Sequence, residues 1–208
     1  LTKQIESEIE RLGFDADGKG WRGRVYLYCL EIKCNSSGWL VPVLPTLVVS
    51  KAKRVIAELI PQADSKRYEI RLKQNASDSD LRNAEQGTIV RNTRFSEAYV
   101  SHQVNGVEHR SSISSIRRDY VDNVNGEKIP KNDLRLWENS DIDFRPDDIL
   151  HERLYAIQWI EDSGATRPKT EFRSVNAEDV DREDKLKKYV HDNLADWQSN
   201  GWIPAIKI

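Results

Sequence analysis

The most informative pattern of apolar and polar positions lies in residues 21–45, which read WRGRVYLYCLEIKCNSSGWLVPVLP. Two sets of side chains alternate at its start, Val25, Leu27 and Cys29 with Tyr26, Tyr28 and Leu30. A repeat of two places neighbouring side chains on opposite faces, so the segment predicts a half-buried strand over 25–32 rather than a helix. A Gly-Trp turn and a proline-punctuated apolar run over 40–49 follow.

Two pairs of further apolar runs predict antiparallel hairpins. Residues 55–60 and 68–72 are separated by the polar stretch PQADSKR, in which Pro61 is expected to fix the entry into the turn. Residues 154–160 and 170–175 are joined by a loop that contains Gly and Pro. Both pairs have the lengths and turn residues of paired strands.

Two short helices are predicted from apolar spacing and end signals. The first ends at Gly13, and its apolar face consists of Leu1, Ile5, Ile9 and Leu12. The second covers 77–86, where Ser77 is a cap, Asp80 follows three residues later and Gly87 stops the helix.

The strongest helix signal begins after Asn176, which is expected to cap it. Apolar residues recur there at spacings of three and four, as Leu186, Tyr189, Val190, Leu194 and Trp197. Acidic residues crowd the first turns and lysines follow, which suits the helix dipole. Gly201 and Pro204 are expected to end this helix.

These elements predict an α+β fold with antiparallel hairpins and a few helices, including the C-terminal amphipathic one. Strands and helices do not alternate as they do in a doubly wound parallel sheet. We expect one domain over 1–208, with a basic half over 1–118 and an acidic half over 133–208. Residues 88–131 are polar, with Asn-Gly turns at 105–106 and 125–126, and are expected to be the least regular and most mobile segment.

Composition narrows the possible environments. Six Trp and seven Tyr favour a folded chain, and a net charge of −2 by itself predicts neither a membrane surface nor a nucleic acid as partner. Cys29 and Cys34 are spaced C-x4-C, which matches neither a zinc ribbon nor a disulfide scaffold, so no metal is expected. No apolar run approaches the ~20 residues that cross a bilayer, and no signal peptide is visible, so the expected location is the cytoplasm. The chain lacks Met and begins at Leu1, so we expect it to be a piece of a larger protein.

Several long blocks, in one consistent order, resemble a single protein family. They are GWRGRVYLYCLEIKC, GWLVPVLPTLVVSKAKRVIAELIP, KRYEIRL, SDSDLRNAEQGTI, ISSIRRDY, LRLWENSD, RPDDILHERLYAIQWI and FRSVNAEDVDREDKLKKYVHDNLADWQSNGWIPAIKI. Together they resemble the middle region of the large adenine-specific DNA methylases of prokaryotic anti-phage gene clusters, which carry an N-terminal domain of unknown function. The resemblance covers nearly the whole chain, and its specificity lies in the order of the blocks.

The resemblance implies a parent enzyme that transfers a methyl group from S-adenosylmethionine to the amino group of a flipped adenine. The family binds the donor at a Gly-rich turn and orients the adenine with an Asp-Pro-Pro-Tyr motif, and this sequence contains neither. By resemblance, then, the chain is a non-catalytic insertion between the two halves of the catalytic fold, without a cofactor of its own. Many relatives carry paired cysteines that suit zinc ribbons, whereas Asn35-Ser36-Ser37-Gly38 follows Cys34 here, which indicates a metal-free version.

Such an insertion is expected to read DNA, to dock other components of a defence complex, or to brace the remaining regions of the parent methyltransferase. Charge gives a hint of the first role, because residues 51–118 hold 13 Lys and Arg against 8 Asp and Glu, while 133–208 hold 11 against 17. The candidate DNA-binding residues are Lys51, Lys53, Arg54, Arg110, Arg117 and Arg118.

Each candidate group also has an ordinary structural interpretation. If Lys51 and Lys53 share a strand face, they reach successive phosphates, but lysines also protect exposed sheet edges. The arginines flank SSISSI, whose hydroxyls suit phosphate or base-edge contacts or simply cap a helix. Ordinary solvated surface is the alternative for the whole basic region.

The tryptophans favour packing over base stacking. Trp159 and Trp197 lie in periodic patterns typical of a core, whereas Trp39 and Trp202 follow Gly at turns, where packing against the sheet is the default. For Trp137 the sequence does not decide between packing and base stacking.

One acidic constellation resembles a restriction nuclease only weakly. Asp147, Glu171 and Arg173 approximate a Pro-Asp…Glu-x-Lys pattern with Arg in place of the final Lys. Asp147 and Asp148 more simply cap a turn or helix after Pro146.

Overall fold

The computed structural model describes residues 7, 9–92, 97–118, 120–121, 124, 126–129, 138 and 140–204. The chain divides into two compact units. Unit 1 comprises Leu1–Tyr28, Leu136–Asp143 and Leu154–Ile208, and unit 2 comprises Cys29–Arg135 and Phe144–Arg153. The halves expected from charge, 1–118 and 133–208, have different bounds.

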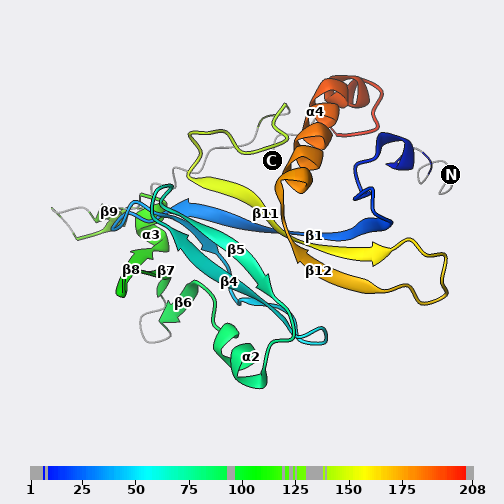
Figure 1. Cartoon of the computed structure of the whole chain (residues 1–208). Coiled ribbons are helices and arrows are strands. Elements are labelled where there is room, and N and C mark those ends of the chain that lie inside the picture. The colour runs from blue at the N-terminus through cyan, green and yellow to red at the C-terminus, as the bar shows by residue number, and fades with distance from the viewer. Residues whose placement is uncertain are drawn as a thin grey trace. The chain divides into compact units, whose positions relative to one another are not determined.

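Unit 1 contains three neighbouring strands, β12 (Thr170–Ser174), β11 (Leu150–Glu161) and the first residues of β1 (Trp21–Lys33). The pairing of β11 with β12 is antiparallel, with Ala156 opposite Ser174 and Ile160 opposite Thr170, which confirms the predicted hairpin (Figure 1). Its apolar core consists of Leu154, Ile157 and Trp159, with Trp21 and Val175 packed against them.

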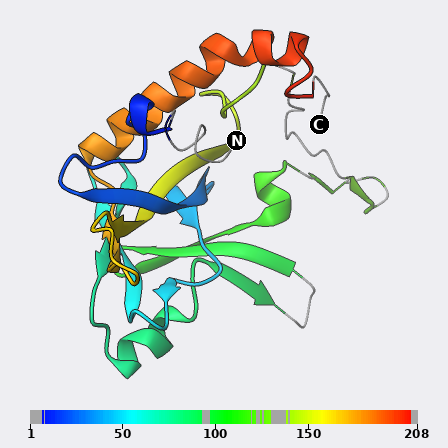
Figure 2. The same cartoon turned by 90° about the vertical axis from the view of Figure 1, so that its right-hand side faces the viewer.

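The predicted C-terminal helix is confirmed as α4 (Ala177–Ser199), one continuous helix in Figure 2. Asn176 accepts a hydrogen bond from the Asp179 backbone N–H at 3.0 Å, and Asp179 accepts one from the Asn176 N–H at 2.9 Å. This reciprocal capping box satisfies two donors that a helix start leaves open. Of the predicted stripe only Leu194 is buried, whereas Leu186 is 41% exposed.

The predicted N-terminal helix is helical at residues 9–12, and the rest of it lies largely outside the described residues. Gly13 donates to the Ile9 carbonyl at 2.9 Å and has φ of +68°, as expected at a helix end. The ring of Phe14 lies 5.7 Å from that of Tyr189 of α4, so the end of this segment packs on the long helix.

Unit 2 contains the end of β1 and β2 (Leu40–Val43), β5 (Arg67–Lys73), β4 (Val55–Gln62) and β3 (Val48–Ser50) in that spatial order. All these pairs are antiparallel except β2 with β5, which meet in parallel at Leu40 and Arg67. The predicted β4–β5 hairpin is confirmed, but Pro61 does not enter the turn. It lies within β4 opposite Tyr68, and the turn follows at residues 63–66.

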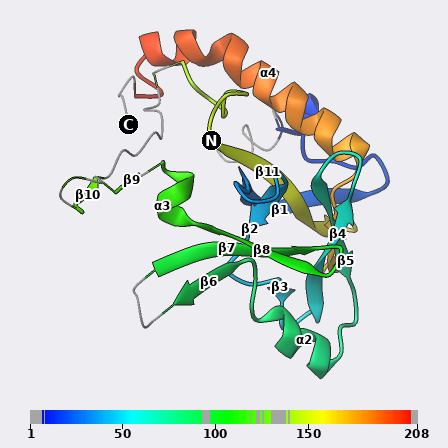
Figure 3. The same cartoon turned by 90° about the vertical axis from the view of Figure 1, so that its left-hand side faces the viewer.

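The expectation that residues 88–131 are the least regular segment is wrong for much of that range. An antiparallel sheet forms there from β6 (Ile89–Asn92), β7 (Glu97–Val104) and β8 (Val107–Ser112), followed by α3 (Ile113–Ile116) and the short pair β9 (Tyr120–Val121) and β10 (Lys128–Ile129) (Figure 3). Asn105 and Gly106 have φ of 51° and 77°, so the predicted Asn-Gly turn joins β7 to β8. The apolar pattern hid these strands because polar residues such as His102 and Ser111 occupy their buried positions. Asn125 lies outside the described residues.

The core of unit 2 has more buried members than that of unit 1 among the described residues. Its buried members are Ile32, Cys34, Trp39, Val41, Tyr68, Val100 and Ile116. The rings of Trp39 and Tyr68 lie 5.3 Å apart at a tilt of 52°. A smaller cluster lies under α2 (Asp78–Ala84), whose predicted capping box between Ser77 and Asp80 is confirmed.

One charged group lies wholly inside unit 2. The Glu31 carboxylate has no exposed surface and accepts hydrogen bonds from Arg67 Nε at 2.9 Å and Arg153 Nη1 at 2.7 Å. Arg153 Nη1 also donates to the Tyr68 carbonyl at 2.7 Å. A buried carboxylate without a cationic partner would be costly, so both guanidinium groups are held close to Glu31. Since Glu31, Arg67 and Arg153 belong to β1, β5 and β11, these contacts fix the three strands relative to one another.

The α+β fold class with antiparallel hairpins and a C-terminal helix is therefore confirmed. Among the helices of the described ranges, none has the length and apolar character needed to cross a membrane.

Candidate nucleic-acid interface

All six candidate DNA-binding residues lie in unit 2, and the two units differ in charge. Unit 2 contains 19 Lys and Arg against 16 Asp and Glu, whereas unit 1 contains 13 against 18. The excess of basic residues predicted over 51–118 thus belongs to one compact unit.

The condition for contact with successive phosphates, that Lys51 and Lys53 share a strand face, is not met, because both lie in the turn between β3 and β4. Arg54 N–H donates to the Lys51 carbonyl at 3.1 Å, and Lys53 N–H to Ser50 Oγ at 3.2 Å. Arg54 itself has φ of 53°, the left-handed conformation that closes such turns.

Lys51 and Arg54 connect this turn to the two ends of α2. Arg54 donates from Nε to the Ala76 carbonyl and from Nη2 to Asp78, each at 2.7 Å, while Lys51 Nζ lies 2.8 Å from Glu85. Hydrogen bonds donated by Arg54 and Lys51 lower the pKa of Asp78 and of Glu85, respectively. Exposed ion pairs of this kind contribute only about 0–1 kcal/mol, so a phosphate can displace either carboxylate at little cost.

Arg110 lies on β8 with an exposed side chain. It forms a two-pronged pair with Glu108, Nε at 2.9 Å and Nη2 at 2.8 Å, and its guanidinium lies 5.0 Å from the centre of the Tyr99 ring. A hydrogen bond from Arg110 lowers the pKa of Glu108. The flat, solvent-facing guanidinium is suited to phosphate, although Glu108 occupies it in this structure.

The serines of SSISSI are bonded within the chain rather than presented to solvent as a set. Ser112 caps α3 by accepting from Ser115 N–H at 3.1 Å, which confirms the capping alternative. Ser115 Oγ donates to the Ser112 carbonyl at 2.8 Å, and Ser111 is buried. Arg117 forms the C-terminal cap, and Arg118 follows with φ of 60°.

Arg118 lines a polar cavity of about 320 Å³ within unit 2. Lys33 and His151 add two further basic groups, and Asn35 and Ser115 add polar ones. Two acidic residues of the neighbouring turn also line it, Asp147 and Asp148.

That turn has the predicted capped form. Asp148 Oδ2 accepts from the Arg145 N–H at 2.7 Å, and Asp148 N–H donates to the Arg145 carbonyl at 3.0 Å, with Pro146 at the first central position. Asp148 therefore serves the turn as an acceptor. Asp147 lines the cavity together with its basic groups.

A buried polar network supports the wall of this cavity. Ser111 Oγ lies 3.2 Å from Cys34 Sγ and accepts from the Asn35 N–H at 3.1 Å, while Asn35 Nδ2 donates to the Ser115 carbonyl at 3.3 Å. Burial opposes the thiolate form of Cys34, but hydrogen bonds from Ser111 and neighbouring groups outweigh it and lower its pKa to about 5. The backbone and the side chain of Asn35 are thus both held by hydrogen bonds, so its position in the cavity lining is set before any ligand binds.

The network continues into the core through His102. Its Nε2 lies 3.1 Å from Ser37 Oγ and its Nδ1 2.8 Å from Tyr68 Oη, which donates to the Gln103 carbonyl at 2.8 Å. Sequence reasoning missed this cluster. A polar residue occurs at a buried position of each strand, His102 on β7 and Ser111 on β8. The sequence shows these residues, but only the fold shows that they point inward.

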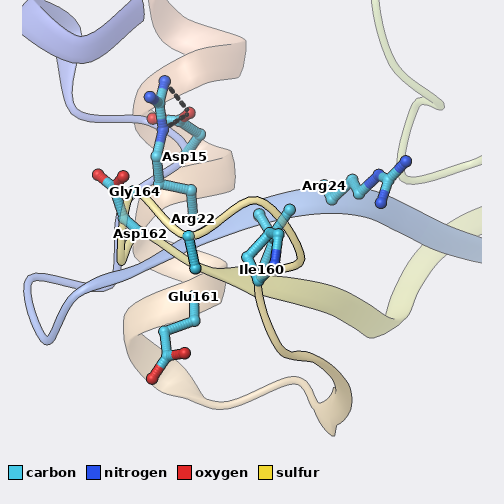
Figure 4. Close-up of a pocket in the computed structure, with 10 residues that line it drawn as sticks. Asp15, Arg22, Arg24, Ile160, Glu161, Asp162 and Gly164 are labelled. Carbon is cyan, nitrogen blue, oxygen red and sulfur yellow. Dashed lines mark hydrogen bonds and ion pairs between the residues drawn. The ribbon is translucent and has the colours of Figure 1, made fainter.

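Unit 1 carries a separate shallow pocket of about 460 Å³ around the start of β1 and the end of β11. Asp15 and Arg22 form an ion pair of 2.9 Å on one side of it, and Arg24 extends away from that pair (Figure 4). The hydrogen bond that Arg22 donates to Asp15 raises the pKa of Arg22. With Asp15, the residues Glu161 and Asp162 bring the lining to three carboxylates against two arginines, so it has no basic excess that would suit phosphate.

The tryptophan predictions have mixed outcomes. Trp159 and Trp39 are buried as expected, at 2% and 7% exposure. Trp197 is half-buried, and Trp202 is 71% exposed, so the expectation that Trp202 packs against the sheet is wrong. Trp137 lies outside the described residues.

The nuclease-like pattern is not assembled as a metal site. Arg173 pairs with Glu171 and with Asp17 at 2.9 Å in unit 1, whereas Asp147 belongs to unit 2. Over the ranges that the structure describes, no group of three or more His, Cys, Asp or Glu side chains is placed to hold a metal ion. Cys29 and Cys34 are both free and buried.

Comparison with known proteins returned no relative: no protein-family model, no curated protein and no solved structure matches this chain.

Proposed function

We propose that this chain contacts duplex DNA through unit 2, as a non-catalytic inserted domain of an S-adenosylmethionine-dependent adenine-specific DNA methyltransferase. It contributes there to target-DNA recognition or to the assembly of the enzyme. The observation that carries the DNA contact is the polar cavity of the more basic unit, whose lining includes Arg118, Lys33 and His151.

Other candidate cations of unit 2 provide further contact points outside the cavity. Lys51, Arg54 and Arg110 are exposed, and each pairs with an acidic partner at the surface. Phosphate carries a full negative charge and releases counterions when bound, so it competes well against such weak pairs. Ser112 and Ser115 bond within the chain and are therefore not expected to read bases. Contact with the phosphate backbone of the DNA is then the main expected mode.

The methyltransferase context rests on the ordered sequence blocks. Neither a Gly-rich donor-binding turn nor an Asp-Pro-Pro-Tyr motif occurs in the sequence, so donor binding and methyl transfer are assigned to other regions of the parent. The inserted domain would then act by holding DNA against that catalytic region.

Fluorescence anisotropy of a labelled duplex, titrated with the chain at several salt concentrations, tests the DNA contact. Binding is expected to weaken steeply with salt, because each phosphate contact contributes about −0.9 to the logarithmic salt slope. The triple substitution Arg110→Ala, Arg117→Ala and Arg118→Ala is expected to reduce the slope by up to about 3.

A matched control removes the same charge from unit 1. Arg167, Lys185 and Lys188 are exposed there, and their triple alanine substitution is expected to leave the slope unchanged. An equal loss in both triple variants would reveal only a general charge effect, and the absence of binding at low salt would overturn the proposal.

A second candidate function is a protein-interaction module that docks other components of an anti-phage defence complex. Exposed apolar residues of unit 1 favour it, among them Val25, Tyr28, Val180 and Leu186, each 40–44% exposed. This role predicts co-purification with a partner protein and no DNA binding by the chain.

A further inference from the structure

Unit 1 contains an apolar pocket that the proposed DNA contact does not use. Its volume is about 420 Å³, within the range of small-molecule sites. Three aromatic rings, Phe14, Tyr26 and Tyr28, and three aliphatic side chains, Ile9, Leu154 and Leu186, form most of its lining. An aromatic lining of this kind provides electron-rich ring faces.

The polar groups of the lining are mostly acidic. Three carboxylates, Asp15, Asp179 and Glu183, face one guanidinium, that of Arg182. The positive charge of Arg182 is already balanced, because Arg182 pairs with the buried Asp179 and its guanidinium lies 5.4 Å from the centre of the Trp159 ring. Asp15 and Glu183 also pair with cations, Arg22 and Lys187, but these two lie outside the lining, so the lining itself carries more carboxylates than cations.

Asp15 contributes an acceptor that lacks a donor. Its Oδ2 accepts from Arg22 at 2.9 Å, but its Oδ1 is buried and has no hydrogen-bond partner among the described residues. A buried carboxylate oxygen without a donor costs free energy, and positive charge placed in the adjoining pocket lowers that cost through its field, without direct contact.

Close packing holds Tyr26 in place at this site. A side chain added at Gly23 would overlap the Tyr26 hydroxyl, so the ring lies directly over the glycine. Burial raises the pKa of Tyr26, and Asp15 adds to that effect. The ring thus stays neutral and fixed beside the carboxylate.

We propose that this pocket binds a small organic cation, an ammonium group that carries apolar substituents. The alkyl groups fill the apolar lining, the charge lies against the rings of Tyr26 and Tyr28, and Asp15 supplies the counter-charge. Quaternary ammonium groups satisfy all three requirements, since they have no N–H groups to leave unpaired and are weakly hydrated.

The test uses choline as probe, with 3,3-dimethyl-1-butanol as its neutral isostere of nearly the same shape. Each is titrated into the full chain and followed by the amide resonances of β1 and α4. Choline is expected to shift the signals of Tyr26, Tyr28 and Leu186 saturably, and to bind at least about fivefold more tightly than the isostere, which corresponds to about 1 kcal/mol of cation–π attraction.

Two substitutions locate the effect. Tyr28→Leu keeps an apolar wall but removes a ring, and Asp15→Asn keeps an acceptor for Arg22 but removes the charge. Each is expected to weaken choline binding about threefold or more while leaving the isostere unaffected. Tyr99→Leu in unit 2 is the matched control and is expected to change neither.

Equal affinity for choline and the isostere would overturn the proposal and identify an apolar docking surface instead. Absence of saturable choline binding would overturn it as well. Neither result bears on the DNA contact of unit 2, which has its own readout.

Discussion

The two units satisfy their buried groups to different degrees. In unit 2 the fully buried Glu31 meets two arginines, and Cys34, Ser111 and His102 form a continuous network. In unit 1 two buried polar atoms, Asp15 Oδ1 and Trp159 Nε1, have no partner among the described residues, and Leu186 of α4 remains 41% exposed.

The buried polar groups of unit 2 are thus bonded to one another, whereas unit 1 has buried polar atoms that are not bonded within the described chain. Among the described residues of unit 2, no buried side-chain nitrogen or oxygen lacks a hydrogen-bond partner, so its capacity for interaction lies in exposed cations and the polar cavity. Unit 1 carries the acidic excess and an apolar pocket, which suit a cationic or apolar ligand. We infer that the two units serve different partners.

The largest expected effect contrasts the core of unit 2 with the exposed face of α4 in unit 1. Trp39→Ala removes a ring that is 7% exposed in the core of unit 2, and such truncations cost about 3–5 kcal/mol. Leu186→Ala, on the exposed side of α4, is expected to cost less than about 1 kcal/mol. Denaturant unfolding measures both, and comparable costs would contradict the contrast in packing.

Breaking the buried charge cluster is the next largest change. Arg153→Ala leaves Glu31 with a single, partly exposed partner, and is expected to lower the free energy of unfolding by about 3 kcal/mol. Lys188→Ala breaks an exposed pair with Asp192 in unit 1 and is expected to cost under about 0.5 kcal/mol. A small loss in Arg153→Ala would show that Arg67 alone compensates Glu31.

The Cys34 network gives a smaller effect that depends on pH. Ser111→Ala removes the acceptor of the Asn35 N–H and is expected to cost about 1–2 kcal/mol. It should also raise the pKa of Cys34 from about 5, which the ultraviolet absorbance of the thiolate reports.

The sign of that pH dependence follows from linkage. Because the folded pKa of Cys34 lies below the 9.0 of an ordinary thiol, its contribution to stability is fully present above that pH and is lost as the pH falls through about 5. Cys29 is opposite: burial raises its pKa to about 12, so its contribution is lost as the pH rises through about 12. A Cys34 titration that Ser111→Ala does not change would contradict the role given to this network.

The smallest predicted effect concerns the start of α4. Asn176→Ala removes one half of the capping box and is expected to cost about 1 kcal/mol. Amide exchange in the first turn of α4 should increase, while exchange at the capped α2 of unit 2 stays unchanged. Faster exchange in both helices would indicate a global loss rather than a local one.

Sequence predicted best where local signals and burial agree. The caps at Ser77 and Asn176, the Asn-Gly turn at 105–106 and both hairpins depend on residues close in the chain, and all are confirmed. The strands β6 to β8 were missed because their buried positions carry His102 and Ser111, which pair with residues distant in sequence. Periodicity detects burial through hydrophobicity and therefore misses polar groups that are buried together.

The candidate site was predicted incompletely for the same reason. Arg118 was found from local charge, but Lys33, Asn35 and His151 come from other segments and carry no local signal. The division into units follows long-range contacts, so the charge-based bounds differ from it.

Hydrogen–deuterium exchange of the chain, with and without a short DNA duplex at low salt, tests the central claim most directly. We expect slower exchange at residues 51–54 and 107–118 of unit 2, with no change along α4 of unit 1. Protection confined to α4, or none in unit 2 under conditions where the duplex is bound, would contradict it.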